Sequence, residues 1–223
     1  DALSTSGILV GNAASDEELS AWAARIDERL VPAGAADFFA AILESQPAPQ
    51  RMNGVRNSIA PGSRALYLCG SNFPSSQKAV AEAGNQGASV VGMPDEVYYS
   101  GDVNFEAVLA WARDVESALS ENNMVIVAAS QPQQGDCLSG RQITAAMAEV
   151  VGHVVRHNAV DELMIEGGAT SQAVMAVLQI DNLYPSDALA PGVTRMRVDN
   201  YPELHITMKP GSYRWPDEIW NAK

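Results

Sequence analysis

The sequence has few of the residues that build disulfide frameworks or zinc centres. It contains two cysteines, Cys69 and Cys137, and three histidines among 223 residues. The two cysteines stand far apart, without the paired spacing of a zinc site. This scarcity, together with the lack of a signal-peptide pattern, leads us to expect a reducing, cytoplasmic setting. No apolar stretch is long enough to suggest a membrane span.

Positive charge is also scarce. Lysine and arginine together number 14 against 27 acidic residues, so the formal net charge is -13. Such a chain does not attract DNA, RNA or an anionic membrane surface at long range, and no basic cluster changes that expectation. Any phosphate recognition must therefore be local, made by backbone amides and a few side chains.

Several well-known catalytic motifs are missing. The sequence has no GxxxxGK[ST] loop, no GxGxxG fingerprint and no GxSxG elbow, which argues against P-loop enzymes, ordinary dinucleotide-binding domains and serine hydrolases of that type. His153 and His157 are four residues apart on an expected helix, a spacing compatible with a metal. No HExxH glutamate lies between them, so we expect a structural role and no metal site.

The composition is that of a folded protein, with 47% hydrophobic and 18% charged residues. The length allows one large α/β domain, which we favour, or two small domains. Apolar runs predict strands, which are residues 7–13, 30–34, 65–70, 87–93, 124–129 and 163–165. Segments with helical spacing alternate with them, at residues 15–29, 35–44, from about 74, 105–119, 139–157 and 170–180.

Strands that are apolar on both faces predict a mostly parallel sheet covered by helices on both sides, a three-layer α/β/α fold. Near the C-terminus, residues 193–198 and 204–209 predict a small antiparallel edge pair, and residues 215–220 a short helix. Residues 46–63 are rich in proline, glycine and polar residues and predict a loop or linker.

The stretch most suggestive of chemistry is residues 163–179, LMIEGGATSQAVMAVLQ. A short apolar strand meets Gly167 and Gly168, and Thr170 and Ser171 then begin a helix, which their hydroxyls can cap. Glycines allow a tight turn and close approach of the backbone to a ligand. The amides and dipole of the helix N-terminus attract phosphate. Alternatively, the glycines serve only the turn of an ordinary loop.

Two further junctions combine glycine with hydroxyl residues. They are Gly70-Ser71, after the predicted strand 65–70, and the run from Lys209 through Gly211 to Ser212. Because ligands of parallel sheets bind at the carboxyl ends of the strands, we expect Ser71 and Gly167 to face one crevice.

In order along the chain, LYLCGSNFPSSQ, IEGGATSQAV and HITMKPGSY resemble the carboxyl-terminal nucleotide-binding domain of the four-carbon acid sugar kinase family, formerly DUF1537. The opening runs GNAASDEEL and LVPAGAADFFAAIL resemble the segment that precedes this domain in the family. The resemblance covers nearly the whole chain. It implies that residues 1–45 join a missing sugar-binding half to the nucleotide domain, residues 64–223.

Members of this family have two domains and use ATP with Mg²⁺ to phosphorylate sugar acids such as erythronate, threonate or 3-oxo-tetronate. The resemblance implies that ATP or ADP contacts Ser71, Gly167, Gly168, Ala169, Thr170 and Gly211. No stretch resembles the sugar-acid motif of the amino-terminal half. We therefore expect a fragment that reaches its sugar acid through an absent domain, is inactive alone and can form a homodimer.

This sequence also departs from the family pattern. Ala169 stands where the family has Asp or Glu, which removes a side chain that could serve Mg²⁺, and Glu166 could replace it only if the loop bends differently. Other departures are Asn12, Phe73, Ser76 and Arg214. They keep open a non-catalytic nucleotide- or metabolite-binding domain, and an unrelated enzyme on the same architecture.

Four other residues have two interpretations each. Lys209 is either a point charge near a phosphate or a strand-end lysine in solvent. Asp136 and Cys137 either line the crevice or belong to an ordinary polar loop. Trp215 is either a packing or a base-stacking residue, as is Trp220.

Overall fold

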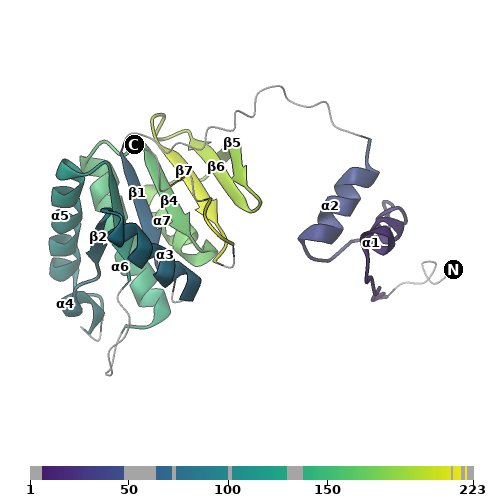
Figure 1. The fold of residues 1–223 in the computed structure, drawn as a ribbon, viewed down its shortest axis with the longest axis horizontal. Helices are drawn as coiled ribbons and strands as arrows, with labels where there is room; N and C mark the ends of the chain where they lie inside the picture. The colour runs from purple at the N-terminus through teal and green to yellow at the C-terminus, as the bar shows by residue number, and fades with distance from the viewer. Residues whose placement is uncertain are drawn as a thin grey trace. The chain divides into compact units, whose positions relative to one another are not determined.

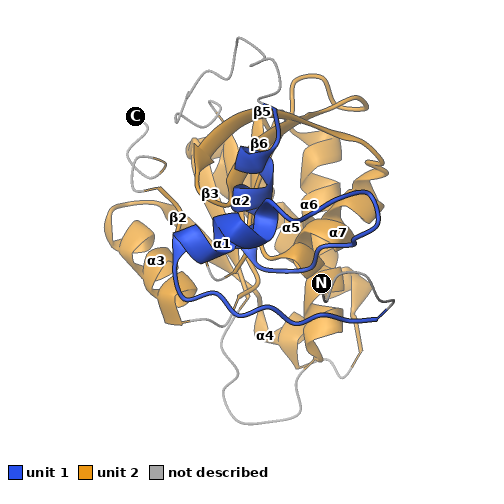
Figure 2. Ribbon diagram, turned by 90° about the vertical axis from the view of Figure 1, so that its right-hand side faces the viewer, with its two compact units in different colours: residues 1–54 blue, residues 55–223 orange. Residues whose placement is uncertain are grey.

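The computed structural model describes residues 7–47, 64–71, 74–99, 102–129, 138–211, 213–216 and 219. The chain divides into two compact units, Asp1–Gly54 and Val55–Lys223, which Figure 2 colours separately. No helix in the described part of the chain is long and apolar enough to span a bilayer.

The first unit contains two helices, α1 (Asp16–Ala23) and α2 (Ala36–Ser45). As predicted, Ser15 caps α1, because its side chain accepts a hydrogen bond from the amide of Glu18. The helix is shorter than the predicted 15–29. Its interior burial is slight, since Ala23 is its single buried residue, so little packing holds further turns in place.

The two strands predicted in this unit are wrong. Residues 7–13 and 30–34 form no strand, and the apolar side chains of the first run are exposed, with Ile8 97% and Val10 83% accessible. A strand needs a neighbouring backbone to bond its amides and carbonyls. Among residues 7–47, no such neighbour is present.

The second unit is built on a seven-stranded sheet with the order β2-β3-β1-β4-β7-β6-β5 (Figure 1). The strands are β1 (Ala65–Cys69), β2 (Ser89–Gly92), β3 (Met124–Ala128), β4 (Glu162–Glu166), β5 (Leu183–Ala190), β6 (Val193–Val198) and β7 (His205–Lys209). The first five strands in this order, β2, β3, β1, β4 and β7, are parallel to one another, and β6 pairs antiparallel with both β7 and β5. The prediction of a mostly parallel sheet with an antiparallel edge is confirmed.

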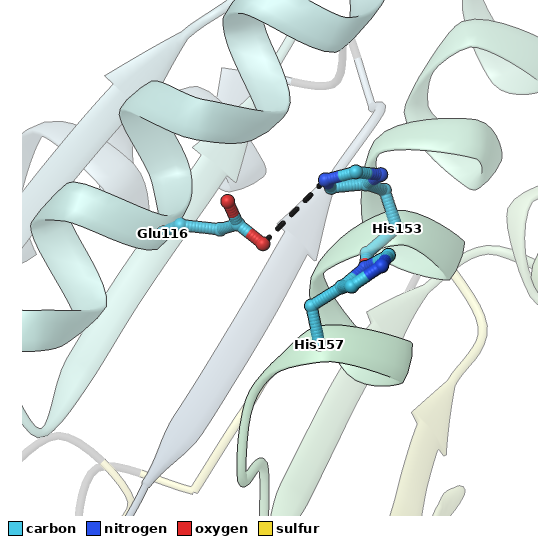
Figure 3. Close-up of side chains that lie close together, drawn as sticks. All are labelled: Glu116, His153 and His157. Carbon is cyan, nitrogen blue, oxygen red and sulfur yellow. Dashed lines mark hydrogen bonds and ion pairs between the residues drawn. The ribbon is translucent and has the colours of Figure 1, made fainter.

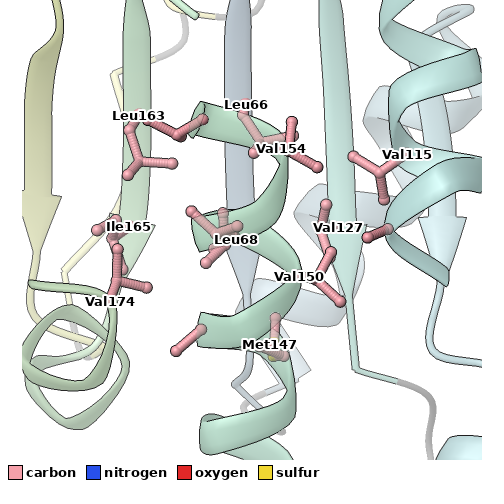
Figure 4. Close-up of a cluster of buried hydrophobic side chains, with 14 of the residues drawn as sticks. Leu66, Leu68, Val115, Val127, Met147, Val150, Val154, Leu163, Ile165 and Val174 are labelled. Carbon is pink, nitrogen blue, oxygen red and sulfur yellow. The ribbon is translucent and has the colours of Figure 1, made fainter. Parts of the chain in front are cut away.

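Helices cover both faces of this sheet, which confirms the predicted α/β architecture. The larger core cluster joins the sheet to α5 (Phe105–Glu121), α6 (Gly140–His157) and α7 (Gly168–Leu178). In Figure 4, Val150 and Val154 of α6 pack over Leu66 and Leu68 of β1. The short helix α4 (Asp95–Tyr98) adds Val97 to the same cluster. On the other face, α3 (Pro74–Asn85) contributes Val80 and Ala83 to a smaller cluster.

The central strands β1 and β4 are buried at every position. Alternate residues of each therefore face different helices, and the strand carries apolar side chains on both faces. β5 was not predicted. It contains Pro185, and its eight residues are half-buried or exposed, so it lacks the apolar run that marks a central strand.

Candidate functional site

Three loops meet at one edge of the sheet. Cys69, Glu166 and Lys209 are the last residues of β1, β4 and β7, and they lie opposite one another across these adjacent parallel strands. The segments that follow are residues 70–71, 167–170 and 211, which we call the glycine corner. The structure therefore brings together all six residues that the family resemblance assigns to the nucleotide.

Close contacts join the three segments. The amide of Gly167 donates to the carbonyl of Lys209 over 3.0 Å. A Cβ added at Gly70 would lie 3.2 Å from Oγ1 of Thr170, which is tighter than most real contacts. Nε2 of Gln77, from the first turn of α3, donates to the carbonyl of Ser71 over 2.7 Å. The corner is thus held by its own backbone and by α3.

The N-terminus of α7 has the geometry of an anion site. Gly167 precedes the helix with φ 95°, a conformation that favours glycine, and no side chain caps the helix. A Cβ added at Gly167 or at Gly168 would meet nothing within 4 Å, so the space above them is open. The first amides of a helix have no acceptor within it and carry partial positive charge, so they suit a phosphate.

The hydroxyls of this turn do not cap the helix, contrary to the sequence-based expectation. Thr170 and Ser171 lie inside α7 and are buried. Oγ of Ser171 donates to the carbonyl of Gly167 over 3.0 Å. It therefore points back at the loop, and the amides of the first turn are left for a ligand.

Next to the corner, two charged side chains form a buried pair. Nζ of Lys209 lies 2.9 Å from Oε1 of Glu166, and the side chains are 3% and 0% accessible. Glu166 also accepts hydrogen bonds from the hydroxyls of Tyr67, over 2.7 Å, and Ser76. The interpretation of Lys209 as a solvent lysine is wrong. Its charge is compensated by Glu166, which lowers its value as a point charge for a phosphate.

Two aromatic residues, Trp215 and Tyr67, pack beside this pair. Nζ of Lys209 lies 5.6 Å from the ring centroid of Trp215, a cation–π distance, and Trp215 packs edge-on against Tyr67 at 5.5 Å. Trp215 is 7% accessible, so packing accounts for it. Burial is the main cause that raises the pKa of Tyr67 far above its ordinary value, and the neighbouring carboxylate of Glu166 adds to it, so Tyr67 remains a neutral donor.

Cys69 is not a nucleophile of this site. Burial raises the pKa of its thiol, whereas reactive thiols have a lowered pKa and access to solvent. Asp136, Cys137, Ser212, Phe73 and Trp220 lie outside the described residues, so their interpretations stay predictions.

A cavity of about 310 Å³ adjoins the corner on the α3 face of the sheet. It is bounded by α3, by the segment after β7 and by the ends of β4 and β7, with Lys78, Ala79, Glu166, Lys209, Arg214 and Trp215 in its wall. Neither Lys78 nor Ala79 was predicted as a site residue from the sequence. They reach this place because α3 follows β1 directly and lies over the ends of two strands that come much later in the chain.

The corner does not supply a carboxylate for Mg²⁺. Ala169 is exposed at the position where the family has an acid. Both oxygens of Glu166 accept hydrogen bonds on the α3 face. Mg²⁺ usually takes one or two protein carboxylates in addition to phosphate oxygens, so the described residues of the corner do not fit a protein-held Mg²⁺.

Comparison with known proteins agrees with this geometry. The sequence pattern of the family described as "Nucleotide-binding C-terminal domain" matches residues 66–213. These residues run from β1 to just past the end of β7 and include the whole glycine corner. No curated protein matches the chain.

Solved structures share the fold at low sequence identity. A Salmonella typhimurium LT2 protein, provisionally named a tRNA synthase, is 20% identical over 94% of this chain and 50% of its own, with TM-score 0.66. A Bordetella bronchiseptica DUF1537 protein, a domain-swapped dimer with bound citrate, is 16% identical over 94% and 50%, with TM-score 0.60. A Haemophilus influenzae DUF1537 protein is 18% identical over 95% and 52%, with TM-score 0.58. The chain spans about half the length of these proteins.

Proposed function

This chain belongs to the family of nucleotide-binding C-terminal domains carried by DUF1537 proteins, and on that premise we propose that it is the ATP-binding part of a kinase for four-carbon sugar acids. The acceptors would be acids such as erythronate, threonate or 3-oxo-tetronate. Catalysis of this kind is mainly positioning and charge stabilisation at the transferred phosphoryl group.

The observation that carries the proposal is the convergence of the three loops of the glycine corner. They follow adjacent parallel strands, and the space over Gly167 and Gly168 is open at an uncapped helix N-terminus. In the proposed complex, the amides of residues 168–170 donate to phosphate oxygens, and Ser71 and Gly211 border the same phosphates. This arrangement needs no lysine, in keeping with the missing P-loop.

We place the nucleoside in the adjoining cavity. Its volume of about 310 Å³ is at the lower end of the range for small-molecule sites, roughly 300–1,000 Å³. Glu166 and Lys209 end the strands that carry two loops of the corner, so a ligand can extend from the corner into the cavity. Mg²⁺ would arrive bound to the nucleotide phosphates, since the corner offers it no carboxylate.

The other half of the active site would come from an amino-terminal domain. The related structures are about twice as long as this chain, which leaves room for a sugar-acid domain and its catalytic base. We expect the chain alone to bind nucleotide without turning over sugar acids, and the whole protein to form a homodimer, as the Bordetella relative does.

Calorimetry with ATP, ADP and NAD, each with and without Mg²⁺, tests nucleotide choice. A micromolar dissociation constant for ATP or ADP, about 8 kcal/mol of binding free energy, is the expected result. Tight binding of NAD alone would reject the proposal. Steady-state kinetics of the whole protein on a panel of tetronates then tests the kinase activity.

The exposed Ala169 favours a second candidate, a non-catalytic nucleotide- or metabolite-binding domain. In that case the whole protein would bind ATP and phosphorylate none of the tetronates. Ala169→Asp restores the family's acidic residue at an exposed position. Mg²⁺-dependent turnover in the unaltered whole protein would favour the kinase, whereas turnover that appears only in Ala169→Asp would favour the non-catalytic domain. The same variant of the isolated chain controls for changes in ATP affinity.

A further inference from the structure

Two histidines and a glutamate meet between neighbouring helices, away from the glycine corner. Glu116 is on α5, and His153 and His157 are on the last turns of α6. Figure 3 shows the carboxylate of Glu116 directed toward the two imidazole rings. One ligand atom from each of the three side chains lies within 4.8 Å of the others, and Nε2 of His153 is 3.6 Å from Oε1 of Glu116.

Hydrogen bonds orient two of these groups. Nδ1 of His157 lies 2.7 Å from the carbonyl oxygen of His153. A carbonyl only accepts, so Nδ1 carries the proton and Nε2 keeps its lone pair for a ligand. Nδ2 of Asn158 donates to Oε1 of Glu116 over 2.8 Å. Metal-binding histidines and carboxylates are held by bonds of this kind.

We propose that Glu116, His153 and His157 bind a divalent transition-metal ion, with Zn²⁺ as its representative. Two histidines and one glutamate, with water as fourth ligand, form a known tetrahedral zinc set. Ligand atoms of such a site are ~3.3 Å apart, given bonds of about 2.0–2.1 Å. From 4.8 Å, the side chains must therefore close by at most about 1.5 Å.

The surroundings favour a cation at this place. The side chains of His153 and Glu116 are 28% and 24% accessible, so they can adjust and an ion can enter. α6 ends at His157, and the C-terminus of a helix carries partial negative charge. The site also lies apart from the nucleotide. α6 begins on the chain after β3 at the carboxyl edge of the sheet, and its histidines are at its opposite end.

The sequence alone favoured a structural role for the histidines because their third partner comes from another helix. The packing of α5 on α6 supplies the third ligand, the carboxylate of Glu116, which no residue of the segment around the two histidines provides. The alternative to a metal site is an ion pair between Glu116 and a protonated His153.

Calorimetric titration of the metal-free chain with ZnCl₂, without nucleotide, tests the proposal. We expect one equivalent to bind. His153→Gln and His157→Gln should each weaken binding by about 100-fold, because even residues that only orient metal ligands account for roughly 10- to 100-fold. His205→Gln removes the histidine of β7 and serves as the matched control, with unchanged affinity. Circular dichroism checks that each variant is folded.

Absence of binding, or a loss below tenfold in both His153→Gln and His157→Gln, would overturn the proposal and leave the ion pair. Anomalous diffraction at the zinc edge provides a second readout that does not depend on variants. A peak bounded by Glu116, His153 and His157 is expected in zinc-soaked crystals, and a peak only elsewhere contradicts the site. Gly168→Leu should bind Zn²⁺ normally whether or not it binds ATP, which separates this proposal from the proposed function.

Discussion

A substitution at Gly168 tests ligand binding separately from folding. It is the first residue of α7, its backbone is not in the left-handed region, and an added Cβ would meet nothing within 4 Å. A leucine at this position therefore fits the protein. Its side chain would occupy the open space where we place the phosphates, so Gly168→Leu should fold normally and lose nucleotide.

The expected loss follows from the hydrogen bonds removed. If the leucine keeps phosphate from two backbone amides, each bond to a charged group contributes about 1.5–3 kcal/mol, or about 3–6 kcal/mol for both. Because 1.4 kcal/mol corresponds to a factor of ten, the dissociation constant for ATP should rise by at least about 100-fold. Stability should change by no more than about 0.5 kcal/mol, as for other substitutions that disturb no contact.

The chain contains a matched control. Gly140 is the first residue of α6, and a Cβ there would also meet nothing within 4 Å. Unlike α7, α6 has a capping box between Ser139 and Gln142, which already engages the backbone amides of these two residues. Gly140→Leu should bind ATP like the unaltered chain.

Calorimetry with ATP and thermal unfolding of the three proteins measure both quantities. Unchanged ATP affinity in Gly168→Leu, or an equal loss in Gly140→Leu, would refute the assignment of phosphate to the α7 N-terminus. A large fall in melting temperature for Gly168→Leu would contradict the open space above this residue.

Three further predictions concern the cavity and its buried pair. Ala79→Trp should fill the cavity and weaken ATP binding. In parallel titrations, the affinity for pyrophosphate should not change. Equal losses of affinity for ATP and pyrophosphate would place the nucleoside elsewhere. Lys209→Met leaves the carboxylate of Glu166 buried without its cation and should lower the free energy of unfolding by about 3–5 kcal/mol. In urea titrations, the double variant Lys209→Met with Glu166→Gln should recover most of this loss. If it recovers none, the ion pair does not account for the stability lost in Lys209→Met. Tyr67→Phe removes the hydrogen bond to Glu166 and should lower the free energy of unfolding by about 1.5–3 kcal/mol. Since the folded pKa of Tyr67 is raised, the stability that this residue contributes is present below its unfolded pKa and is lost only as pH rises through its folded pKa. Alkaline absorbance titration of the native chain should therefore show one more non-titrating tyrosine than the same titration of Tyr67→Phe.

The sequence predicted the central part of the fold well because strands buried on both faces leave a strong signal. β1 and β4 are apolar runs bounded by polar or glycine residues, and the adjoining helices carry their apolar residues at helical spacing. Ser15 and Ser139 also marked the starts of α1 and α6, since both side chains accept hydrogen bonds from the first turn.

The errors concern strands, because whether a segment forms a strand depends on a neighbouring backbone that its own sequence does not show. Residues 7–13 have the composition of a buried strand, yet Ile8 is 97% accessible, because strand formation depends on a neighbouring backbone. β5 is the opposite case. Its mixed pattern gave no signal, but pairing with β6 makes it a strand.

Site residues, too, could be predicted only where the sequence around them contains the signal. The glycine corner could be predicted because glycine and hydroxyl residues directly follow apolar strands in the sequence. The burial of Lys209 could not, since it depends on Glu166, Tyr67 and Trp215, which reach it from separate segments. Glu116 was missed for the same reason, because only the packing of α5 on α6 brings it to the histidines.

The most direct test of the central claim is a crystal structure of the chain with a non-hydrolysable ATP analogue. The account predicts phosphate oxygens at hydrogen-bond distance, about 2.7–3.2 Å, from the amides of residues 168–170, with Ser71 and Gly211 bordering the same phosphates. A nucleotide bound with its phosphates away from these three loops would contradict it.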